Sequence, residues 1–360
     1  MRVNGKLYKT LWTENNAVKI IDQTKLPFEF KIRELKNLDS FCDAISTMKV
    51  RGAPLIGVTA AFGMATSIRI DSSNKNIEQS YNKLLLTRPT AVNLKWAIDI
   101  IKDKCIKIEI KSRPTKALKI ANEILKNDIT ACKAIGNYGY NIIENIYKKK
   151  KTTVNILTHC NAGWLAAIDW GTALAPIFKA KKKNIPLHVW VDETRPRNQG
   201  ALLTSWELNN EKIPNTVIVD NAGGHLMKNG MVDLCLVGSD RTTLNGDVCN
   251  KIGTYLKALA AFDNKIPFYV ALPLSTIDRS IKSSRDNIQI EERSSDEISH
   301  VKSLDNNKVK DRRIFPRKVQ TFNPAFDVTP SKFVTGLITE YGICAAKKTE
   351  ITKILKKKCE

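Results

Sequence analysis

The sequence predicts an α/β fold in two parts: a mostly helical N-terminal part with a small sheet, then a part built on a doubly wound parallel sheet. Between about residues 35 and 147, apolar residues recur at spacings of three and four, which is typical of helices that bury one face. From Thr152 onward, short continuous apolar runs alternate with helical patterns, as in a parallel sheet covered on both faces. A chain of 360 residues is long enough for two domains, which we place at residues 1–150 and 151–360.

The N-terminal part offers two arginines close to helix starts. Residues 1–30 contain short alternating runs that predict the small sheet, and from Ile32 the pattern becomes helical. Pro54 suits a first helical turn, so Arg51, Gly52 and Ala53 stand just before a helix. Arg88 likewise precedes a helix start. Helix N-termini favour anions and guanidinium binds phosphate through two hydrogen bonds, so a phosphate site is one interpretation; ordinary surface arginines beside helix caps are the other.

The second part contains the sheet. Polar segments follow its predicted strands and should gather at the carboxyl edge, where open α/β sheets bind ligands. The charged stretch Ile288–Gln320 interrupts the pattern, and we expect an irregular surface excursion there. The predicted strands are Val154–Thr158, Leu187–Val191, Thr216–Val219, Val232–Val237, Phe268–Leu272 and Val334–Ile338.

Two residues at strand ends are candidate catalytic residues. Cys160 follows the first strand of the sheet, and Ala162-Gly163 is expected to lead into a long apolar helix, whose N-terminal dipole can lower the pKa of a thiol. Asp240 follows the fourth strand. Strand ends of this kind can face one pocket, where a thiol and a carboxyl group form an acid/base pair. The alternatives are a buried structural cysteine and a carboxylate that caps a turn or helix.

Composition limits the function classes. The net charge is +22, but the lysines cluster in runs typical of helix ends, loops and a tail, so we expect a solvated surface and no specific nucleic acid. Eight scattered cysteines without a C-x-x-C pair argue against a zinc ribbon and a disulfide framework and favour a reducing cytoplasm. We expect no membrane span and no secretory signal. Common nucleotide, hydrolase and metalloprotease motifs are missing, and a metal site is unsupported.

Several motifs in order closely resemble the methylthioribose-1-phosphate isomerases, a family that groups with the α, β and δ subunits of translation initiation factor 2B. The resemblance runs from about Arg51 to Ile343 and so covers most of the chain. Its motifs are Arg51-Gly-Ala-Pro-Leu-Ile-Gly, Thr158-His-Cys-Asn-Ala-Gly, Asp192-Glu-Thr-Arg-Pro, Gln199-Gly, Gly238-Ser-Asp-Arg, Gly246-Asp-Val-Cys-Asn-Lys-Ile-Gly and Asn323-Pro-Ala-Phe-Asp-Val-Thr-Pro.

The resemblance implies an aldose–ketose isomerase of methionine salvage that converts 5-methylthio-ribose 1-phosphate into 5-methylthio-ribulose 1-phosphate. It implies a Rossmann-like second domain, no metal or other cofactor, and a cytoplasmic homodimer. Cys160 and Asp240 fall on the catalytic positions of the family. The substrate-binding positions are Arg51, Gly52, Ala53, Arg88, Gln199, Asn250 and Lys251. The chain departs from the family pattern at Ser294–Gln320, which is longer, more basic and poorer in glycine.

Some alternatives stay open at this stage. The hydrogen on C2 can move to C1 as a proton through an enediol-like state or as a hydride. A related isomerase would act on 5-deoxyribose 1-phosphate or ribose 1,5-bisphosphate, which differ only at C5. A non-catalytic regulatory subunit of the initiation-factor type would share the fold but should lack the paired cysteine and aspartate.

Overall fold

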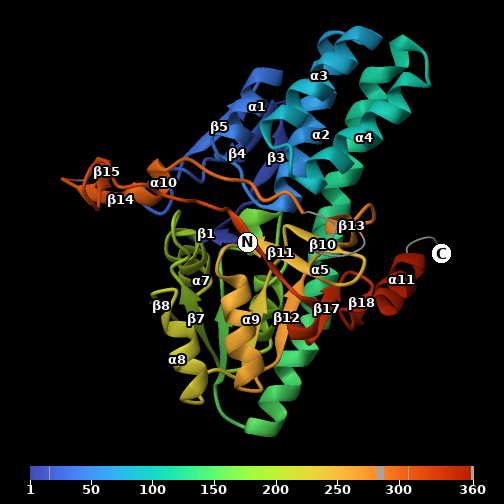
Figure 1. The fold of residues 1–360 in the computed structure, drawn as a ribbon. Helices are drawn as coiled ribbons and strands as arrows, with labels where there is room; N and C mark the ends of the chain where they lie inside the picture. The colour runs from blue at the N-terminus through green and yellow to red at the C-terminus, as the bar shows by residue number, and fades with distance from the viewer. Residues whose placement is uncertain (16, 282–287, 307, 358–360) are drawn as a thin grey trace.

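A computed structural model describes residues 1–15, 17–281, 288–306 and 308–357. Figure 1 shows the N-terminal helices stacked at one end of a large sheet, with helix α5 extending from the first part into the second. The N-terminal part comprises a β1–β2 hairpin, a β3–β4–β5 sheet and a group of helices. Its elements are β1 (Arg2–Val3), β2 (Lys6–Leu7), β3 (Leu11–Glu14), β4 (Ala17–Ile21), β5 (Ile32–Leu35), α1 (Leu38–Ser46), α2 (Ala53–Ile70), α3 (Asn74–Thr87), α4 (Val92–Ile106), η1 (Ile110–Ser112) and α5 (Arg113–Lys150).

Helix α2 is the centre of the N-terminal core. It contacts α1, α3, α4 and α5, and close approach of α4 depends on Gly57, where an added Cβ would lie 2.8 Å from the Asn93 carbonyl oxygen. By length and composition alone α2 could cross a membrane, but 78% of it is buried inside this protein. Its apolar character is therefore explained by its place in the core.

The large sheet has seven strands in the order β18-β17-β12-β9-β6-β7-β8. All neighbours pair in parallel except β17 and β18. The chain runs outward from β6 through β7 to β8, then returns to the other side of β6 for β9, so the switch point lies between β6 and β9. The strands are β6 (Val154–Thr158), β7 (Leu187–Asp192), β8 (Asn215–Ile218), β9 (Leu234–Val237), β12 (Phe268–Ala271), β17 (Gly336–Thr339) and β18 (Gly342–Cys344).

Helices and smaller sheets surround this sheet. The second half of α5 packs on α6, while α8 and α9 form another pair, with α9 against β9 and β12. A four-stranded sheet of order β13-β10-β11-β16 stands between the large sheet and the N-terminal part. The remaining elements are η2 (Trp164–Ala166), α6 (Leu174–Lys182), η3 (Gly200–Thr204), α7 (Ser205–Asn210), α8 (Ala222–Lys228), β10 (Arg241–Thr243), β11 (Val248–Lys251), α9 (Thr254–Asp263), η4 (Leu274–Thr276), β13 (Ile277–Asp278), α10 (Asp296–Ser299), β14 (His300–Asp305), β15 (Lys308–Arg313), β16 (Phe326–Thr329), η5 (Ser331–Phe333) and α11 (Lys348–Lys357).

The predicted fold class and all six predicted strands are confirmed, with ends that shift by up to two residues. Three local predictions were wrong. Ile32–Leu35 is a strand, since it pairs with β4. The long helix expected after Gly163 is only η2, and the next helix begins at Leu174. The stretch expected to be an irregular excursion contains α10 and a paired β14–β15 hairpin.

The domain boundary at residue 150 falls at the end of α5. The first half of this helix buries Ala117, Ile120 and Ile124 in the N-terminal core, whereas its second half buries Ile135 and Ile143 in the core of the large sheet. One helix therefore belongs to both cores, and the division into two domains stays a prediction.

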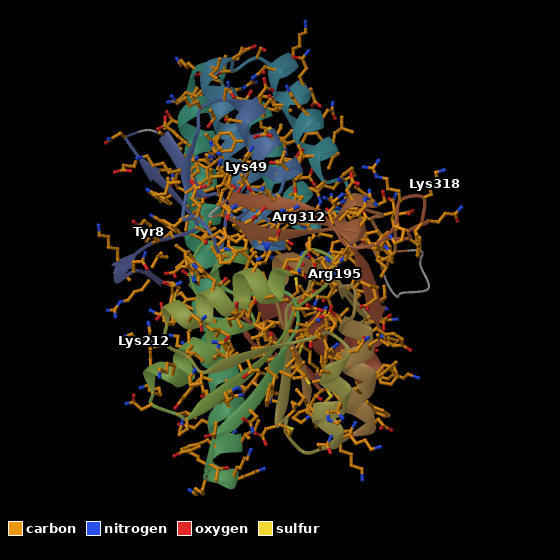
Figure 2. The ribbon with its side chains drawn as sticks, turned by 90° about the vertical axis from the view of Figure 1, so that its left-hand side faces the viewer. Tyr8, Lys49, Arg195, Lys212, Arg312 and Lys318 are labelled. Carbon is orange, nitrogen blue, oxygen red and sulfur yellow. The ribbon has the colours of Figure 1, made fainter. Side chains whose placement is uncertain are left out.

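Positive charge is spread over the molecule. Figure 2 shows Lys49 in the N-terminal part, Lys212 beyond α7 and Lys318 beyond the β14–β15 hairpin, each at a different place. Many basic side chains pair with carboxylates, such as Lys150 with Asp233 at 2.7 Å. This spacing favours a solvated surface over one basic stripe.

Candidate active site

One cavity at the switch point of the large sheet is lined by all nine residues predicted from the sequence. They come from the ends of β6 and β9, from β11, from the start of α2 and from the loops before α4 and η3. These residues are Arg51, Gly52, Ala53, Arg88, Cys160, Gln199, Asp240, Asn250 and Lys251. The structure brings all of them together, while their individual roles stay predictions.

Cys160 lies at the carboxyl end of β6 in a left-handed backbone conformation, with φ of +67°. Its backbone is fixed on both sides, because its N–H donates to Thr194 Oγ1 at 2.8 Å and its carbonyl accepts from Thr204 Oγ1 at 2.7 Å. Burial raises the pKa of the thiol, and the positive charges of Arg51 and Lys251 lower it only in part. The predicted lowering by a helix dipole was wrong, since no long helix begins at Cys160 and desolvation dominates.

Asp240 lies between β9 and β10, and its backbone N–H donates to the Cys249 carbonyl at 3.0 Å. This bond ties the loop to β11 of the smaller sheet, which also supplies Lys251 to the cavity. Burial raises the pKa of the Asp240 carboxyl group, against the lowering effect of Lys251, Arg88 and Arg51. A carboxyl group of this kind retains its proton to higher pH than an exposed aspartate and can act as an acid.

The N-terminus of α2 forms one wall of the cavity. Gly52 precedes the helix with φ of +96°, and an added Cβ would lie 2.5 Å from Ala166. Only glycine therefore fits at this position without strain. The guanidinium of Arg51 is buried and donates to the carbonyl and side-chain oxygens of Asn161. The start of this helix lines the cavity together with positive side chains, and helix N-termini carry N–H groups without intrahelical partners, so the arrangement suits an anion such as phosphate.

Arg88 follows the last residue of α3 and also lines the cavity. Its Nε and Nη2 atoms donate to Glu291 Oε2 at 3.2 and 2.9 Å, and both side chains are largely buried. Glu291 thus fixes the orientation of the Arg88 guanidinium.

Three further predicted residues, Lys251, Asn250 and Gln199, also line the cavity. Lys251 on β11 is buried, which lowers the pKa of its ammonium group, and its Nζ lies 4.7 Å from the centre of the Phe326 ring. Asn250 donates to Thr254 Oγ1 at 3.0 Å. Gln199 is only 5% exposed, and its Oε1 has no partner among the described residues.

A group of possible metal ligands lies beside the cavity but does not suit an ion. Among the described residues, His159, Asp192 and Asp220 bring their donor atoms within 4.8 Å of one another. The ring of His159 is held at 2.8 Å from both Asp192 Oδ2 and the Ile252 carbonyl. Lys257 Nζ lies 3.1 Å from the same Asp192 oxygen, so an ammonium group already supplies positive charge there. The contacts explain these residues as a bridge between β6, β7 and α9.

The sequence analysis missed a buried carboxylate beneath the site. Glu207 accepts hydrogen bonds from Asn161 Nδ2 at 2.9 Å, from the N–H of Trp164 at 2.9 Å and from the N–H of Leu165 at 3.1 Å. Through Asn161 it supports Arg51, and burial raises its pKa to about 7. A glutamate between apolar residues of α7 was the available signal, because such a carboxylate has to find partners inside the protein.

The site therefore combines a thiol and a carboxyl group, whose pKa values burial raises, with three basic side chains and a helix N-terminus. Basic groups and free N–H groups bind an anion, and the two acids can exchange protons with a bound molecule. This arrangement suits acid/base chemistry on a small phosphorylated substrate.

Comparison with known proteins gives a consistent picture. Residues 49–346 match the model of the initiation factor 2 subunit family. Methylthioribose-1-phosphate isomerase of Methylorubrum extorquens is 53% identical, over 97% of this chain and 96% of the relative. The solved structure of 5-methylthioribose 1-phosphate isomerase from Pyrococcus horikoshii has a TM-score of 0.84 and 37% identity, over 98% and 96% of the two chains.

A second solved structure is described as translation initiation factor eIF-2B, subunit delta, from A. fulgidus. It has a TM-score of 0.79 and 36% identity, over 97% of this chain and 100% of that one. The two solved structures resemble the chain almost equally, whereas the relative that is 53% identical is an isomerase. The chain therefore belongs to the initiation factor 2 subunit family and, within it, to the methylthioribose-1-phosphate isomerases.

Proposed function

We propose that this protein is an aldose–ketose isomerase that converts 5-methylthio-ribose 1-phosphate into 5-methylthio-ribulose 1-phosphate in methionine salvage. The observation that supports this most is the meeting of Cys160 and Asp240 in one cavity at the switch point of the sheet. The name of the relatives that match nearly their whole length agrees with it.

The phosphate of the substrate has a natural place in this cavity. It would lie at the N-terminus of α2, within reach of Arg51, Arg88 and Lys251. Because the phosphate sits on C1, the sugar has no free aldehyde until its ring opens. Asp240, whose pKa burial raises, would in its protonated form donate a proton to the ring oxygen as the bond from that oxygen to C1 breaks, and C1 would take on positive charge.

The hydrogen on C2 then moves to C1. In the proton route, Cys160 as thiolate takes the C2 proton, and the electron pair of the C2–H bond forms the C1–C2 double bond. The thiol then returns a proton to C1 while the C2 hydroxyl gives its proton to Asp240. In the hydride route, the hydrogen migrates with its electron pair and the C2 hydroxyl again loses its proton to Asp240. Catalysis in heavy water separates these routes, because only the proton route exchanges label into C1.

The test is the conversion of the sugar phosphate to a ketose by the purified protein. Cys160→Ser and Asp240→Asn should each lower kcat by at least about 100-fold, since a positioned acid or base contributes roughly 10²–10⁴ in rate. Both variants should remain folded. Near wild-type activity in both would exclude this pair as the catalytic groups.

A regulatory subunit without activity is the alternative, and the similarity to an initiation factor structure supports keeping it in view. It predicts that the purified protein converts no sugar phosphate at all. The paired thiol and carboxyl group in one cavity favour the enzyme.

We also propose that the protein is a homodimer of the cytoplasm. Val217 and Val219 at the edge strand β8 expose apolar side chains, which supports association through this edge of the sheet. The described cysteines are free, which suits a reducing compartment. Sedimentation equilibrium of the wild type and of Val219→Lys tests the dimer.

A further inference from the structure

The loop between β7 and η3 contacts Cys160 and contains a threonine in a rare backbone conformation. Thr194 has φ of +65°, a value that side chains branched at Cβ seldom adopt, because Cβ comes too close to the following carbonyl oxygen. Thr194 is fully buried, so its neighbours hold it in this conformation. Backbone outliers of this kind gather at active sites, where they fix a geometry that function needs.

Asp220 holds the backbone of this loop. Its Oδ1 accepts a hydrogen bond from the N–H of Thr194, and its Oδ2 accepts one from the N–H of Arg195, both at 2.7 Å. A carboxylate that accepts from two successive N–H groups fixes the peptide plane between them. Asp220 follows strand β8, which pairs with β7, so the large sheet determines where Thr194 lies.

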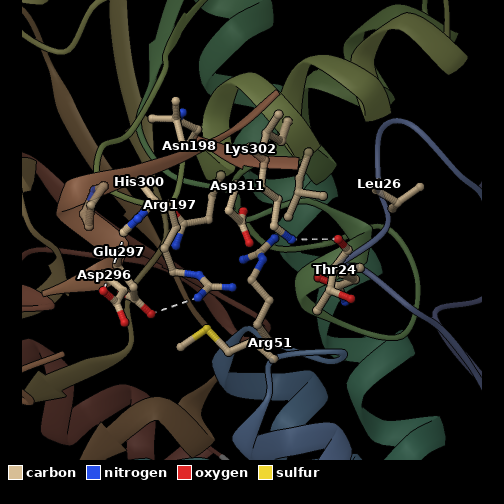
Figure 3. Close-up of a pocket in the computed structure, with 17 residues that line it drawn as sticks. Thr24, Leu26, Arg51, Arg197, Asn198, Asp296, Glu297, His300, Lys302 and Asp311 are labelled. Atoms are coloured by element: carbon tan, nitrogen blue, oxygen red, sulfur yellow. Dashed lines mark hydrogen bonds and ion pairs between the residues drawn. The ribbon is translucent and has the colours of Figure 1, made fainter. Parts of the chain in front are cut away.

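The next residues of the loop are held by α10. Arg195 Nη2 donates to the Ile298 carbonyl at 2.7 Å, and Arg197 Nη1 donates to Glu297 Oε1 at 2.8 Å. Figure 3 shows the ion pair of Arg197 with Glu297 at the edge of a neighbouring cavity. The loop therefore has a second anchor, on the side away from Asp220.

The hydroxyl group of Thr194 connects this anchored loop to Cys160. Its oxygen accepts a hydrogen bond from the backbone N–H of Cys160 at 2.8 Å, and the hydroxyl donates to the Asp192 carbonyl at 3.0 Å. Cys160 itself has φ of +67°, so this hydrogen bond joins two residues with left-handed backbones. A backbone N–H inside a protein needs a partner, so the bond stabilises the conformation in which Cys160 lines the cavity.

The carbonyl side of Cys160 is held by a different threonine. Thr204 Oγ1 donates to the Cys160 carbonyl at 2.7 Å and accepts from Asn161 Nδ2 at 3.0 Å. Asn161 in turn accepts from Arg51, one of the groups proposed to bind the phosphate. Thr204 is therefore linked to both the thiol and the phosphate site, whereas the contacts of Thr194 lead to the thiol.

We propose that Thr194 and Asp220 are positioning residues of the isomerase, which hold the backbone of Cys160 so that its thiol faces the substrate. The proposal rests on the proposed isomerase activity. Neither residue lines the active-site cavity, so both act through Cys160. Loss of the Thr194 hydroxyl should therefore lower kcat and leave KM almost unchanged, since a shift of a reacting group by about 1 Å can cost roughly 100-fold in rate.

The test measures kcat and KM for 5-methylthio-ribose 1-phosphate in threonine variants that remain folded. Thr194→Val keeps the branched shape without the hydroxyl, and it should lower kcat at least about tenfold with KM within about twofold of the wild type. Thr194→Ser keeps the hydroxyl and should restore kcat to within about threefold of the wild type. Thr204→Val should lower kcat and also raise KM, because Thr204 supports Arg51 through Asn161.

The matched control is Thr339→Val at the end of β17. Thr339 is also fully buried, and its hydroxyl likewise donates to a carbonyl, that of Gly342 at 2.9 Å, and accepts from a backbone N–H, that of Tyr341 at 3.2 Å. It does not line the active-site cavity. The variant loses the same two kinds of hydrogen bond and should keep kcat and KM within about twofold of the wild type.

The proposal fails if Thr194→Val and Thr339→Val have the same kcat, if Thr194→Val changes only KM, or if Thr194→Ser does not restore kcat. If Thr194→Val does not fold, Asp220→Asn is measured in the same way. Asparagine cannot accept both N–H groups through its oxygen and nitrogen, so kcat should fall about fivefold or more at unchanged KM, and an unchanged kcat would overturn the proposal. A wild type that converts no sugar phosphate would instead refute the proposed activity, and this proposal with it.

Discussion

Glu207→Gln tests the electrostatics beneath the site. The wild-type carboxyl group is fully buried, and its pKa is raised from an ordinary value of 4.5 to about 7, mainly by burial and against the hydrogen bonds from Asn161, Leu165 and Trp164. Because the folded state binds the proton more tightly than the unfolded state, this group stabilises the fold fully below about pH 4.5. That contribution is lost as the pH rises through about 7.

The size of this effect follows from the two pKa values. One pKa unit equals about 1.36 kcal/mol, so a rise from 4.5 to about 7 amounts to roughly 3 kcal/mol of unfolding free energy between pH 4 and 8. Glutamine cannot titrate, but its amide group places a donor against a backbone N–H and costs about 1–3 kcal/mol at every pH. The variant should therefore be less stable than the wild type by about 1–3 kcal/mol at pH 5, and should equal or exceed it by up to about 2 kcal/mol at pH 8.

The assay is urea unfolding at pH 5, 6, 7 and 8, with Glu123→Gln as a control at an exposed carboxylate. Asp128, whose pKa burial raises to about 7, adds the same pH dependence to all three proteins and cancels in the differences. Because Glu207 supports Arg51 through Asn161, KM for the sugar phosphate should also rise about tenfold, while kcat changes little. Parallel stability curves for the wild type and Glu207→Gln would refute the reasoning.

Three further predictions concern the cavity. Asp240 must be protonated to act as an acid, so kcat/KM should fall as the pH rises through its raised pKa. If the pH profile of kcat/KM falls at a pH no higher than the pKa of an ordinary aspartate, Asp240 does not act as this acid. Gly52→Ala should lower the free energy of unfolding by about 1–3 kcal/mol in chemical denaturation, because φ is +96° and the new Cβ would meet Ala166. Glu291→Gln should lower KM for the sugar phosphate up to about fivefold at unchanged kcat, because the phosphate no longer competes with a carboxylate for Arg88. A raised KM would show that Glu291 instead holds Arg88 in its binding position.

The sequence predicts the sheet well because its strands are buried on both faces. Leu234–Val237, for example, consists only of apolar residues and is buried throughout, which is typical of a strand inside a covered parallel sheet. The convergence of Cys160 and Asp240 then follows from topology, since β6 and β9 are neighbours and parallel strands end at the same edge.

The prediction of a helix after Gly163 failed for a reason that lies far away in the sequence. The N–H groups of Trp164 and Leu165, which would start that helix, donate instead to Glu207. Gly163 and Gly171 pack so closely that an added Cβ on Gly171 would lie 2.2 Å from the Gly163 carbonyl carbon. Local propensity favoured a helix, but a buried carboxylate more than 40 residues away provided other partners for the backbone.

The β14–β15 hairpin could not be recognised because it has no apolar face. Every residue of β15 is exposed, so the alternation that marks a half-buried strand is missing. Its position depends on contacts such as that of Lys302 with the Thr24 carbonyl, which join segments 278 residues apart.

The same cations serve two purposes in the proposed site, and this limits the chemistry of Cys160. Arg51 and Lys251 are the groups that lower the pKa of its thiol, and they are also among the groups proposed to bind the phosphate. A phosphate dianion at that position would offset their positive charge, so burial would dominate and the thiol would hold its proton more firmly. Substrate binding would then favour the protonated form of Cys160. Ring opening by protonated Asp240 leaves a carboxylate, which is also the proposed acceptor for the C2 hydroxyl proton. A proton route through a Cys160 thiolate therefore needs a separate acceptor for the thiol proton, whereas the hydride route needs none.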